Sequence, residues 1–295
     1  MIALVPAMTA LPPADLAALD EAAREYLAAK GRLMGALERA GSVLQSGLHR
    51  LPGDAQRLVA ERARDALELA YRVSVTGLGR DGPPSARAWQ YRAAGMASGL
   101  LGGAGGFATT LVELPVTTAL ILRSIAEVAR AAGHDPDDAE VRAHCIEVFA
   151  FGGPLEEDDD ADLAFWGARL AGREVAGLLV SVAARYAPQV LTKLAAQAAP
   201  VLGGVVGAGL NLLYMQFYQA MARVVFRLLP LEREHGRAPV RAAFAHQVRA
   251  VAARRDSRSS PRGDSRFSTR GDSRFSTRGD SRFSPGGDGR FNAPR

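Results

Sequence analysis

Cysteine and aromatic residues are scarce in this chain of 295 residues, which has one cysteine and 6% Phe, Trp and Tyr. Cys145 has no partner for an internal disulfide, which excludes a disulfide-stabilised secreted domain, and we interpret it as a buried structural thiol. The N-terminus lacks a basic segment followed by a continuous apolar run and a cleavage site, as secretory signals have. We therefore expect the protein in the reducing cytoplasm.

Motifs for the common phosphate, nucleophile and zinc sites are missing as well. There is no GxxxxGK[ST] loop, no GxSxG turn and no HExxH pair among the five histidines. Residues 103–108 match the GxGxxA dinucleotide fingerprint, but no strand pattern precedes them and no ribose-binding acid follows. The acidic residues 156–162 do not have calcium-loop spacing. We therefore predict no metal site and no cofactor.

Positive charge is concentrated near the end of the chain. The formal net charge is +5, and residues 254–295 hold 11 of the 36 basic but only 5 of the 31 acidic residues. The rest of the chain keeps 25 basic and 26 acidic residues, a net charge of −1. The high pI therefore does not indicate a basic surface on the body of the protein.

Residues 254–295 form an octad repeat that contains Arg-Gly-Asp-Ser three times. With at most one Phe per repeat among Arg, Ser and Gly, the segment cannot bury a core, so we predict that it is disordered. Its Arg and Phe residues suit nucleic acid without sequence preference, or anionic lipid head groups. The alternative is neutral expansion of a short repeat. Arg-Gly-Asp is also an integrin adhesion sequence, but no secretion signal accompanies it.

Helical patterns dominate the remainder, in which alanine and leucine are abundant and β-branched runs are few. The hydrophobic content of 48% supports a substantial core. Asp15 and Asp135 stand where helix N-caps are expected, and Pro52-Gly53 separates two helical patterns. We predict an all-α multi-helix bundle at residues 11–253, with glycine-rich buried hairpins, a flexible segment at 1–10 and a disordered tail at 254–295.

Two long intervals carry no charge. Residues 93–112 are 20 uncharged residues with six glycines, and residues 194–222 are 29 uncharged residues. The glycines make the first interval only weakly hydrophobic. The strictly apolar part of the second, residues 198–210, spans about 20 Å as a helix, short of the roughly 30 Å of a bilayer core. We predict buried or re-entrant hairpins rather than membrane spans.

Small residues recur at helical spacing in both intervals and predict a close-packing face between two helices. The glycines concerned are Gly95, Gly99, Gly103, Gly203 and Gly207.

A narrow polar stripe follows the first interval. Because Pro115 suits only the first turn of a helix, we place a helix start close to Glu113. We expect later helices to stop near Pro188 and at Pro230. The candidate polar-seam residues are Glu113, Thr117, Arg123, Ser124, Glu127, Glu147 and Asn211. Structural hydrogen bonding is one interpretation of them, and a polar relay or ligand contact is the other.

Two blocks of sequence carry a pattern found in one protein family. Residues 113–126 read E-L-P-V-T-T-A-L-I-L-R-S-I-A, followed by C-I-E-V-F-A-F-G-G from residue 145 and an acidic D-D-A-D segment. Residues 200–211 read P-V-L-G-G-V-V-G-A-G-L-N. The chain resembles the EcsC family in these blocks, and the resemblance extends over about residues 15–240. The matching residues are Glu113, Pro115, Thr117, Arg123, Ser124, Glu147, Gly203, Gly207 and Asn211.

The resemblance implies an all-helical domain with a membrane-linked role, because the family is named for a product encoded beside an ABC exporter. It offers no catalytic residues to transfer. Our first hypothesis is therefore a non-enzymatic, peripherally membrane-associated protein on the inner face of the membrane that binds lipid or a membrane transporter. The alternatives are a hydrolase-like enzyme with Glu113, Arg123, Glu127 and Glu147 around one interior pocket, and nucleic-acid binding through the tail. The sequence gives no indication of oligomeric state.

Overall fold

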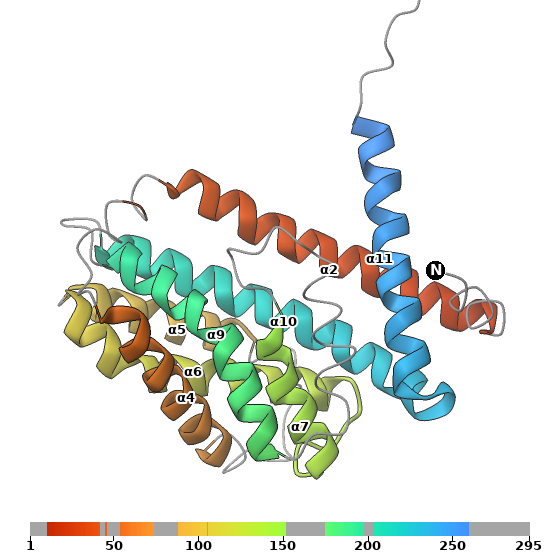
Figure 1. The fold of residues 1–295 in the computed structure, drawn as a ribbon, viewed down its shortest axis with the longest axis horizontal. Helices are drawn as coiled ribbons and strands as arrows, with labels where there is room; N and C mark the ends of the chain where they lie inside the picture. Colours follow the sequence, from red (N-terminus) through yellow and green to blue (C-terminus); the bar gives the residue numbers. More distant parts are fainter. Residues whose placement is uncertain are drawn as a thin grey trace, which may run out of the picture. The chain divides into compact units, whose positions relative to one another are not determined.

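The computed structural model describes residues 11–41, 45, 54–73, 88–104, 106–151, 175–197 and 203–259. Every regular element in these ranges is a helix, which confirms the all-α prediction (Figure 1). The elements are α2 (Pro13–Arg39), α4 (Ala55–Val73), α5 (Ala88–Ala104), α6 (Gly106–Ala131), α7 (Ala139–Glu147), the 3₁₀ helix η2 (Val148–Ala150), α9 (Val175–Gln197), α10 (Gly203–His235) and α11 (Arg237–Ser259). Residues 1–10, the acidic segment at 156–162 and residues 260–295 lie outside the described ranges. Residues 254–259 were predicted to be disordered but form the last part of α11.

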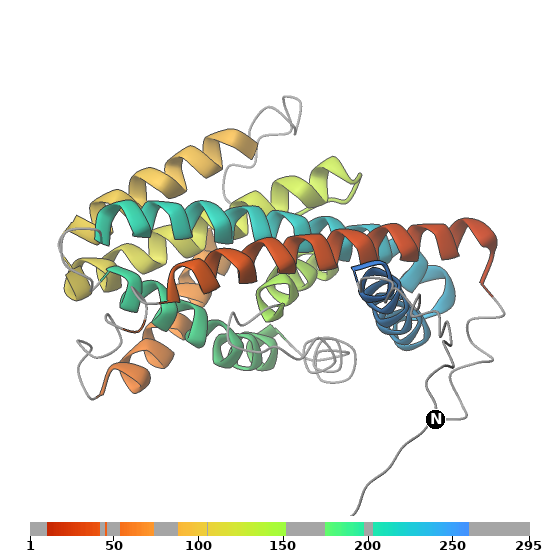
Figure 2. The same ribbon diagram turned by 90° about the horizontal axis from the view of Figure 1, so that it is seen from above.

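Helix α10 is the central element, because α2, α5, α6 and α9 all pack against it. Figures 1 and 2 show α2 along one side of α10 and the α5–α6 pair along another. The prediction that helices from the two uncharged intervals pack together is confirmed by the contacts of α10 with α5 and α6. Of the described residues in the interval 194–222, residues 194–197 end α9 and residues 203–222 begin α10.

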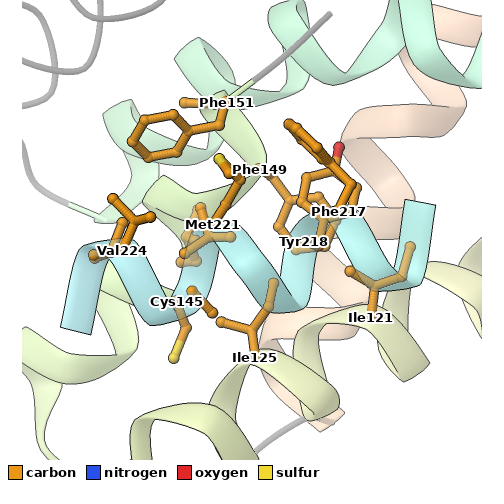
Figure 3. Close-up of a cluster of buried hydrophobic side chains, with 14 of the residues drawn as sticks. Ile121, Ile125, Cys145, Phe149, Phe151, Phe217, Tyr218, Met221 and Val224 are labelled. Carbon is orange, nitrogen blue, oxygen red and sulfur yellow. The ribbon is translucent and has the colours of Figure 1, made fainter. Parts of the chain in front are cut away.

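A cluster of large apolar side chains joins α6, α7, η2 and α10 (Figure 3). Phe149 is fully buried, with its ring centroid 5.1 Å from that of Tyr186 and 4.8 Å from that of Tyr218. Each such side chain contributes about 1.5–3 kcal/mol through its burial. This shared core fixes the relative positions of the helices that supply the polar clusters described below.

Three prolines that were expected to limit helices lie inside them instead. Helix α6 begins at Gly106 and includes Pro115, α9 continues through Pro188, and α10 continues through Pro230. A proline cannot bond the carbonyl four residues earlier and costs about 3 kcal/mol in a helix interior. In α10 that carbonyl belongs to Phe226, and it accepts a hydrogen bond from His134 Nε2 at 3.1 Å. A side chain from another element thus replaces the missing backbone donor.

The connection between α6 and α7 differs in one detail from the sequence prediction. Gly133 ends α6 with a φ of 84°, a left-handed conformation that glycine adopts without a Cβ penalty. The N-cap of α7 is Asp138 rather than Asp135, because the Asp138 side chain accepts from the Glu140 N–H at 2.8 Å. Asp135 instead accepts from the Asp137 N–H in the preceding turn.

Candidate functional site

The predicted polar-seam residues do not form one continuous seam. They divide into a buried cluster around Glu113, a groove between α6 and α10 that includes Ser124 and Glu127, and a second buried cluster around Glu147.

The Glu113 cluster (Ser98, Glu113, Thr117, Lys193 and Asn211) joins four helices. Lys193 Nζ of α9 lies 2.8 Å from Glu113 Oε2 of α6. Asn211 of α10 donates from Nδ2 to Glu113 Oε1 at 3.3 Å and to the Gly95 carbonyl of α5 at 2.8 Å. The hydroxyls of Ser98 and Thr117 also donate to Glu113 Oε1. Four side chains therefore donate to one carboxylate.

The surroundings of Glu113 keep its carboxylate ionised. Burial by itself raises the pKa of Glu113, but the charge and hydrogen bond of Lys193 and the two hydroxyl donors outweigh burial, so the pKa lies below its ordinary value. Burial also lowers the pKa of Lys193, against the opposing effect of Glu113. A carboxylate with a lowered pKa and saturated by donors is a poor general base, whereas it is well suited to hold helices together.

A small internal void lies beside this cluster. The centre of a water molecule can occupy about 10 Å³ of it. Thr117, Lys193, Asn211 and Tyr214 contribute to its wall. The Oδ1 atom of Asn211 is buried and has no hydrogen-bond partner among the described residues. The void has room for about one water molecule and is too small for a substrate.

Lys193 is the functional residue that sequence reasoning missed. The sequence does distinguish this residue, because Lys193 and Lys30 are the only lysines among the 36 basic residues. Lys193 is also the only charged residue between Arg185 and Arg223. Both lysines are buried, whereas arginine supplies the exposed positive charge of the described helices.

The second group lines an open groove of about 600 Å³ between α6 and α10, which we call the α6–α10 groove. Glu127 lies in its wall and pairs with Arg130 at 2.7 Å, and the buried Ser124 donates to the Ile121 carbonyl. Arg123 Nε donates at 3.3 Å to the hydroxyl of Tyr91, which lines the groove. This bond joins Arg123 of α6 to α5.

The third group is the Glu147 cluster (His144, Glu147, Glu232, Arg237 and Arg241). Arg241 of α11 donates from Nη2 to Glu147 of α7 and from Nε to Glu232 of α10, both at 2.8 Å. Burial by itself raises the pKa of Glu147, but the hydrogen bonds and charges of His144 and Arg241 lower it by more, so the pKa lies below its ordinary value. These buried ion pairs attach α11 to the bundle.

Of the five predicted close-packing glycines, Gly95 is the one whose surroundings are described. A Cβ atom placed on Gly95 would lie 3.4 Å from the Met215 side chain, which is ordinary van der Waals contact. The other four lie in helices α5 and α10, and their surroundings fall outside the described side chains.

The four residues assigned to one catalytic pocket in the enzyme hypothesis are not brought together. Glu113 and Glu147 bond to different residues, Glu127 lines the α6–α10 groove, and Arg123 bonds to Tyr91 of α5. Within the described helices, no three His, Cys, Asp or Glu side chains are grouped in a way that could hold a metal ion. The described residues thus form two separate ion-pair clusters and an open groove, and they do not assemble the four residues into one pocket.

Comparison with known proteins adds the family. Residues 78–229, just over half of the chain, match the model of the EcsC protein family. The match is shorter than the resemblance expected over residues 15–240. No curated protein and no solved structure matched the chain. The matched range contains the Glu113 cluster and all but Pro230 of the α6–α10 groove, and on this match the chain belongs to the EcsC family.

Proposed function

We propose that this chain is a non-enzymatic protein that attaches peripherally to the inner face of a membrane by placing one end of its helical bundle in the lipid. The observation that carries the proposal is the convergence of the two uncharged intervals at that end. We call it the uncharged end, comprising residues 96–104 of α5, 106–112 of α6, 194–197 of α9 and 203–210 of α10.

The contacts of the Glu113 cluster fix this convergence. Asn211 bonds to the Gly95 carbonyl, and Glu113 bonds to Lys193, so α5, α6, α9 and α10 meet at this level. Beyond it, the four helices continue to the same side of the bundle (left in Figures 1 and 2). None of the four segments contains a charged residue.

Exposed apolar side chains support contact with lipid. Val205 is 69% exposed, Val116 is 56% exposed and Met96 is 38% exposed. Met96 of α5 and Val205 of α10 belong to the uncharged end, and Val116 of α6 lies four residues from it. An apolar side chain in water gains free energy when it moves into an acyl environment.

The depth of the uncharged end suits the membrane interface. Beyond the Glu113 cluster, α6 extends seven residues to Gly106 and α10 extends eight residues to Gly203, or about 10–12 Å at a rise of 1.5 Å per residue. Interfacial helices bury their apolar faces roughly 5–10 Å into a bilayer. No described helix has both the length and the apolar character needed to cross one.

Flotation of the purified full-length protein with phosphatidylcholine vesicles tests the proposal. We expect the protein to float with these uncharged vesicles and to stay bound in high salt, because apolar insertion is not screened. The double variant Val116→Glu/Val205→Glu should lose at least about tenfold in vesicle partition, since charged side chains resist entry into lipid. Its folding is checked by circular dichroism, because both sites are exposed.

Val180→Glu is the matched control, because Val180 is 49% exposed on α9 but lies 13 residues before Lys193, far from the uncharged end. The control should float like the unmodified protein. Failure of the full-length protein to float with any protein-free vesicle would contradict lipid attachment. Binding only to membranes that contain their own proteins would favour the transporter partner instead.

A further inference from the structure

The α6–α10 groove lies apart from the uncharged end. It runs along residues 124–132 at the end of α6 and residues 219–230 of α10, whereas the uncharged end comprises residues 106–112 and 203–210 of the same helices. These two stretches of the groove are about 12 and 17 Å long at a rise of 1.5 Å per residue. The volume of about 600 Å³ lies within the usual range for small-molecule sites.

Apolar side chains line the groove from both helices. Val128, Ala131 and Ala132 contribute from the end of α6, and Phe226 and Pro230 contribute from α10. Ala131, Ala132 and Pro230 are exposed, so solvent reaches this part of the groove. A hydrocarbon chain laid along these residues would therefore remove apolar surface of both the chain and the protein from water.

The charged side chains that line the groove are paired within the protein. Glu127 pairs with Arg130 at 2.7 Å, and the Glu127 side chain is only 4% exposed. The two arginines of the lining pair with carboxylates of α2, as Arg223–Glu25, Arg227–Glu25 and Arg227–Glu21. Three acidic and three basic side chains thus leave no net charge. A charged ligand would have to compete with one of these pairs, whereas an uncharged ligand would not.

Tyr91 of α5 supplies a hydrogen-bond donor to the groove. Its hydroxyl oxygen accepts from Arg123 Nε at 3.3 Å, and in the described part of the chain its own O–H has no acceptor. The other uncharged polar residues of the lining, Ser124 and Gln219, are buried and already bonded within the protein. A ligand oxygen beside Tyr91 can therefore accept the free O–H.

From these features we infer that the α6–α10 groove binds one molecule of an uncharged lipid, with an acceptor oxygen beside the Tyr91 hydroxyl and the hydrocarbon chain along Val128 and Phe226. The ligand chemistry is an ester, carbonyl or alcohol oxygen on a single long chain, as in a monoacylglycerol or a fatty alcohol. Such molecules reside in membranes, so membrane lipid is the source of the ligand. The site is separate from the uncharged end and does not require that end to insert.

Equilibrium titration of the full-length protein with methyl cis-parinarate, an uncharged fatty ester that fluoresces in apolar surroundings, tests the inference. We expect saturable binding of one molecule per chain and displacement by monooleoylglycerol. Ionised oleate should compete at least about tenfold more weakly, because its carboxylate finds no unpaired cation in the groove. The absence of saturable binding would overturn the inference, as would competition by oleate or by oleylamine as strong as that by monooleoylglycerol.

Ala131→Phe locates the site, because it fills the groove from an exposed position. It should weaken binding of the ester at least about tenfold, and Ala132→Phe replaces it if that variant does not fold. Ala60→Phe on α4, which is also exposed, is the matched control and should bind normally. Full binding by a folded Ala131→Phe or Ala132→Phe protein would overturn the assignment to this groove.

Tyr91→Phe tests the polar end of the site, because it keeps the ring and removes the O–H. It should weaken binding of the ester about three- to tenfold, the value of one hydrogen bond. Diphenylhexatriene, a fluorescent hydrocarbon without oxygen, should bind Tyr91→Phe and the unmodified protein alike. Tyr71→Phe on α4 is the matched half-buried control and should bind both probes normally. Equal loss of both probes in Tyr91→Phe would contradict a hydrogen bond from Tyr91 to the ligand.

The two proposals fail separately. Ala131→Phe should still float with vesicles, and Val116→Glu/Val205→Glu should still bind the ester. A protein that floats but does not bind methyl cis-parinarate disproves the groove site alone. A protein that binds the ester but does not float disproves the membrane proposal alone.

Discussion

At the scale of single residues, the polar side chains set deep in apolar sequence act by satisfying one another. Glu113 is saturated by donors from three side chains on other helices and by one from its own, and the Phe226 carbonyl that Pro230 leaves unbonded is satisfied by His134. A buried polar group without a partner costs about 1–3 kcal/mol, and a buried charge costs more. Replacing any one of these residues should therefore lower the stability of the fold.

The bond from His134 can be tested by a double-mutant cycle. We expect His134→Ala to lower the free energy of unfolding by about 1–3 kcal/mol, because the buried Phe226 carbonyl loses its donor. In a Pro230→Ala background the new backbone N–H at position 230 supplies that bond, so the same change should cost clearly less. Urea unfolding of the four proteins measures the coupling. Equal costs in both backgrounds would show that His134 does not replace the missing backbone donor.

The ion pair between Glu113 and Lys193 leads to a pH-dependent prediction. Glu113→Gln should lower the free energy of unfolding by about 3–5 kcal/mol at pH 7, since it leaves a buried ammonium without its anion. The variant also loses the group that raises the Lys193 pKa, so that pKa falls further below its unfolded value of 10.5. Between the two values the unfolded chain binds more protons, so stability must rise with pH.

Relative to the unmodified protein, Glu113→Gln should therefore recover part of its stability between pH 7 and pH 9.5. The control is Glu113→Gln/Lys193→Met, which removes the buried charge. We expect this control to lose less free energy of unfolding than the two single variants lose together, and to regain no stability at high pH. Urea unfolding at the two pH values measures both effects, and a deficit in Glu113→Gln that does not change with pH would disprove the assignment.

At the scale of elements, the helices differ in how they are held. Helix α10 is held by apolar contacts on most sides. Helix α11 packs Phe244 against Tyr26, at 6.1 Å between ring centroids, places Arg241 between two carboxylates, and donates from Gln247 to Asp20 of α2 at 2.7 Å. Without Arg241, Glu147 would keep only His144 among the described residues, and Glu232 would keep only Arg237. The attachment of α11 is therefore sensitive to one side chain.

Cys145 on α7 reports on this attachment. Burial raises the pKa of its thiol to about 12, so we expect no reaction with a thiol reagent such as DTNB in the folded protein at pH 8. Arg241→Met should cost about 3 kcal/mol and increase the labelling rate about a hundredfold, because opening of this region becomes more frequent. Arg233→Met, which removes an exposed pair with Glu140, should label like the unmodified protein. Equal rates for Arg241→Met and Arg233→Met would contradict this role of Arg241.

At the scale of the whole molecule, charge and apolar surface are separated along the chain. Residues 254–295 carry a net charge of +6, whereas the segments of the uncharged end carry none. Electrostatic binding weakens steeply with salt, whereas apolar insertion does not. Salt dependence therefore separates the contributions of the two regions.

A chain that ends at Ser259 should keep flotation with uncharged vesicles. Any binding of single-stranded nucleic acid by the full chain should be lost in the truncated chain and should fall steeply between 50 mM and 200 mM salt. Fluorescence anisotropy with a labelled oligonucleotide measures it for both chains. Nucleic-acid binding that persists after truncation would place the binding surface on the helical part instead.

The sequence by itself determined the helical class, because helix propensity and apolar spacing are local properties that can be recognised without knowing the tertiary contacts. It also determined that the glycine-rich segments around Gly95 and Gly203 pack together and that Glu113 and Asn211 need partners, because uncharged intervals and isolated polar residues are visible in one dimension. Only the tertiary structure decided which partners they have. Lys193 lies 80 residues from Glu113, and His134 lies 92 residues from Phe226, at separations where no periodic pattern connects them. The helix ends expected at prolines were wrong for the same reason. The sequence shows the cost of a proline inside a helix, but it does not show the packing, or the bond from His134 to Phe226, that offsets this cost.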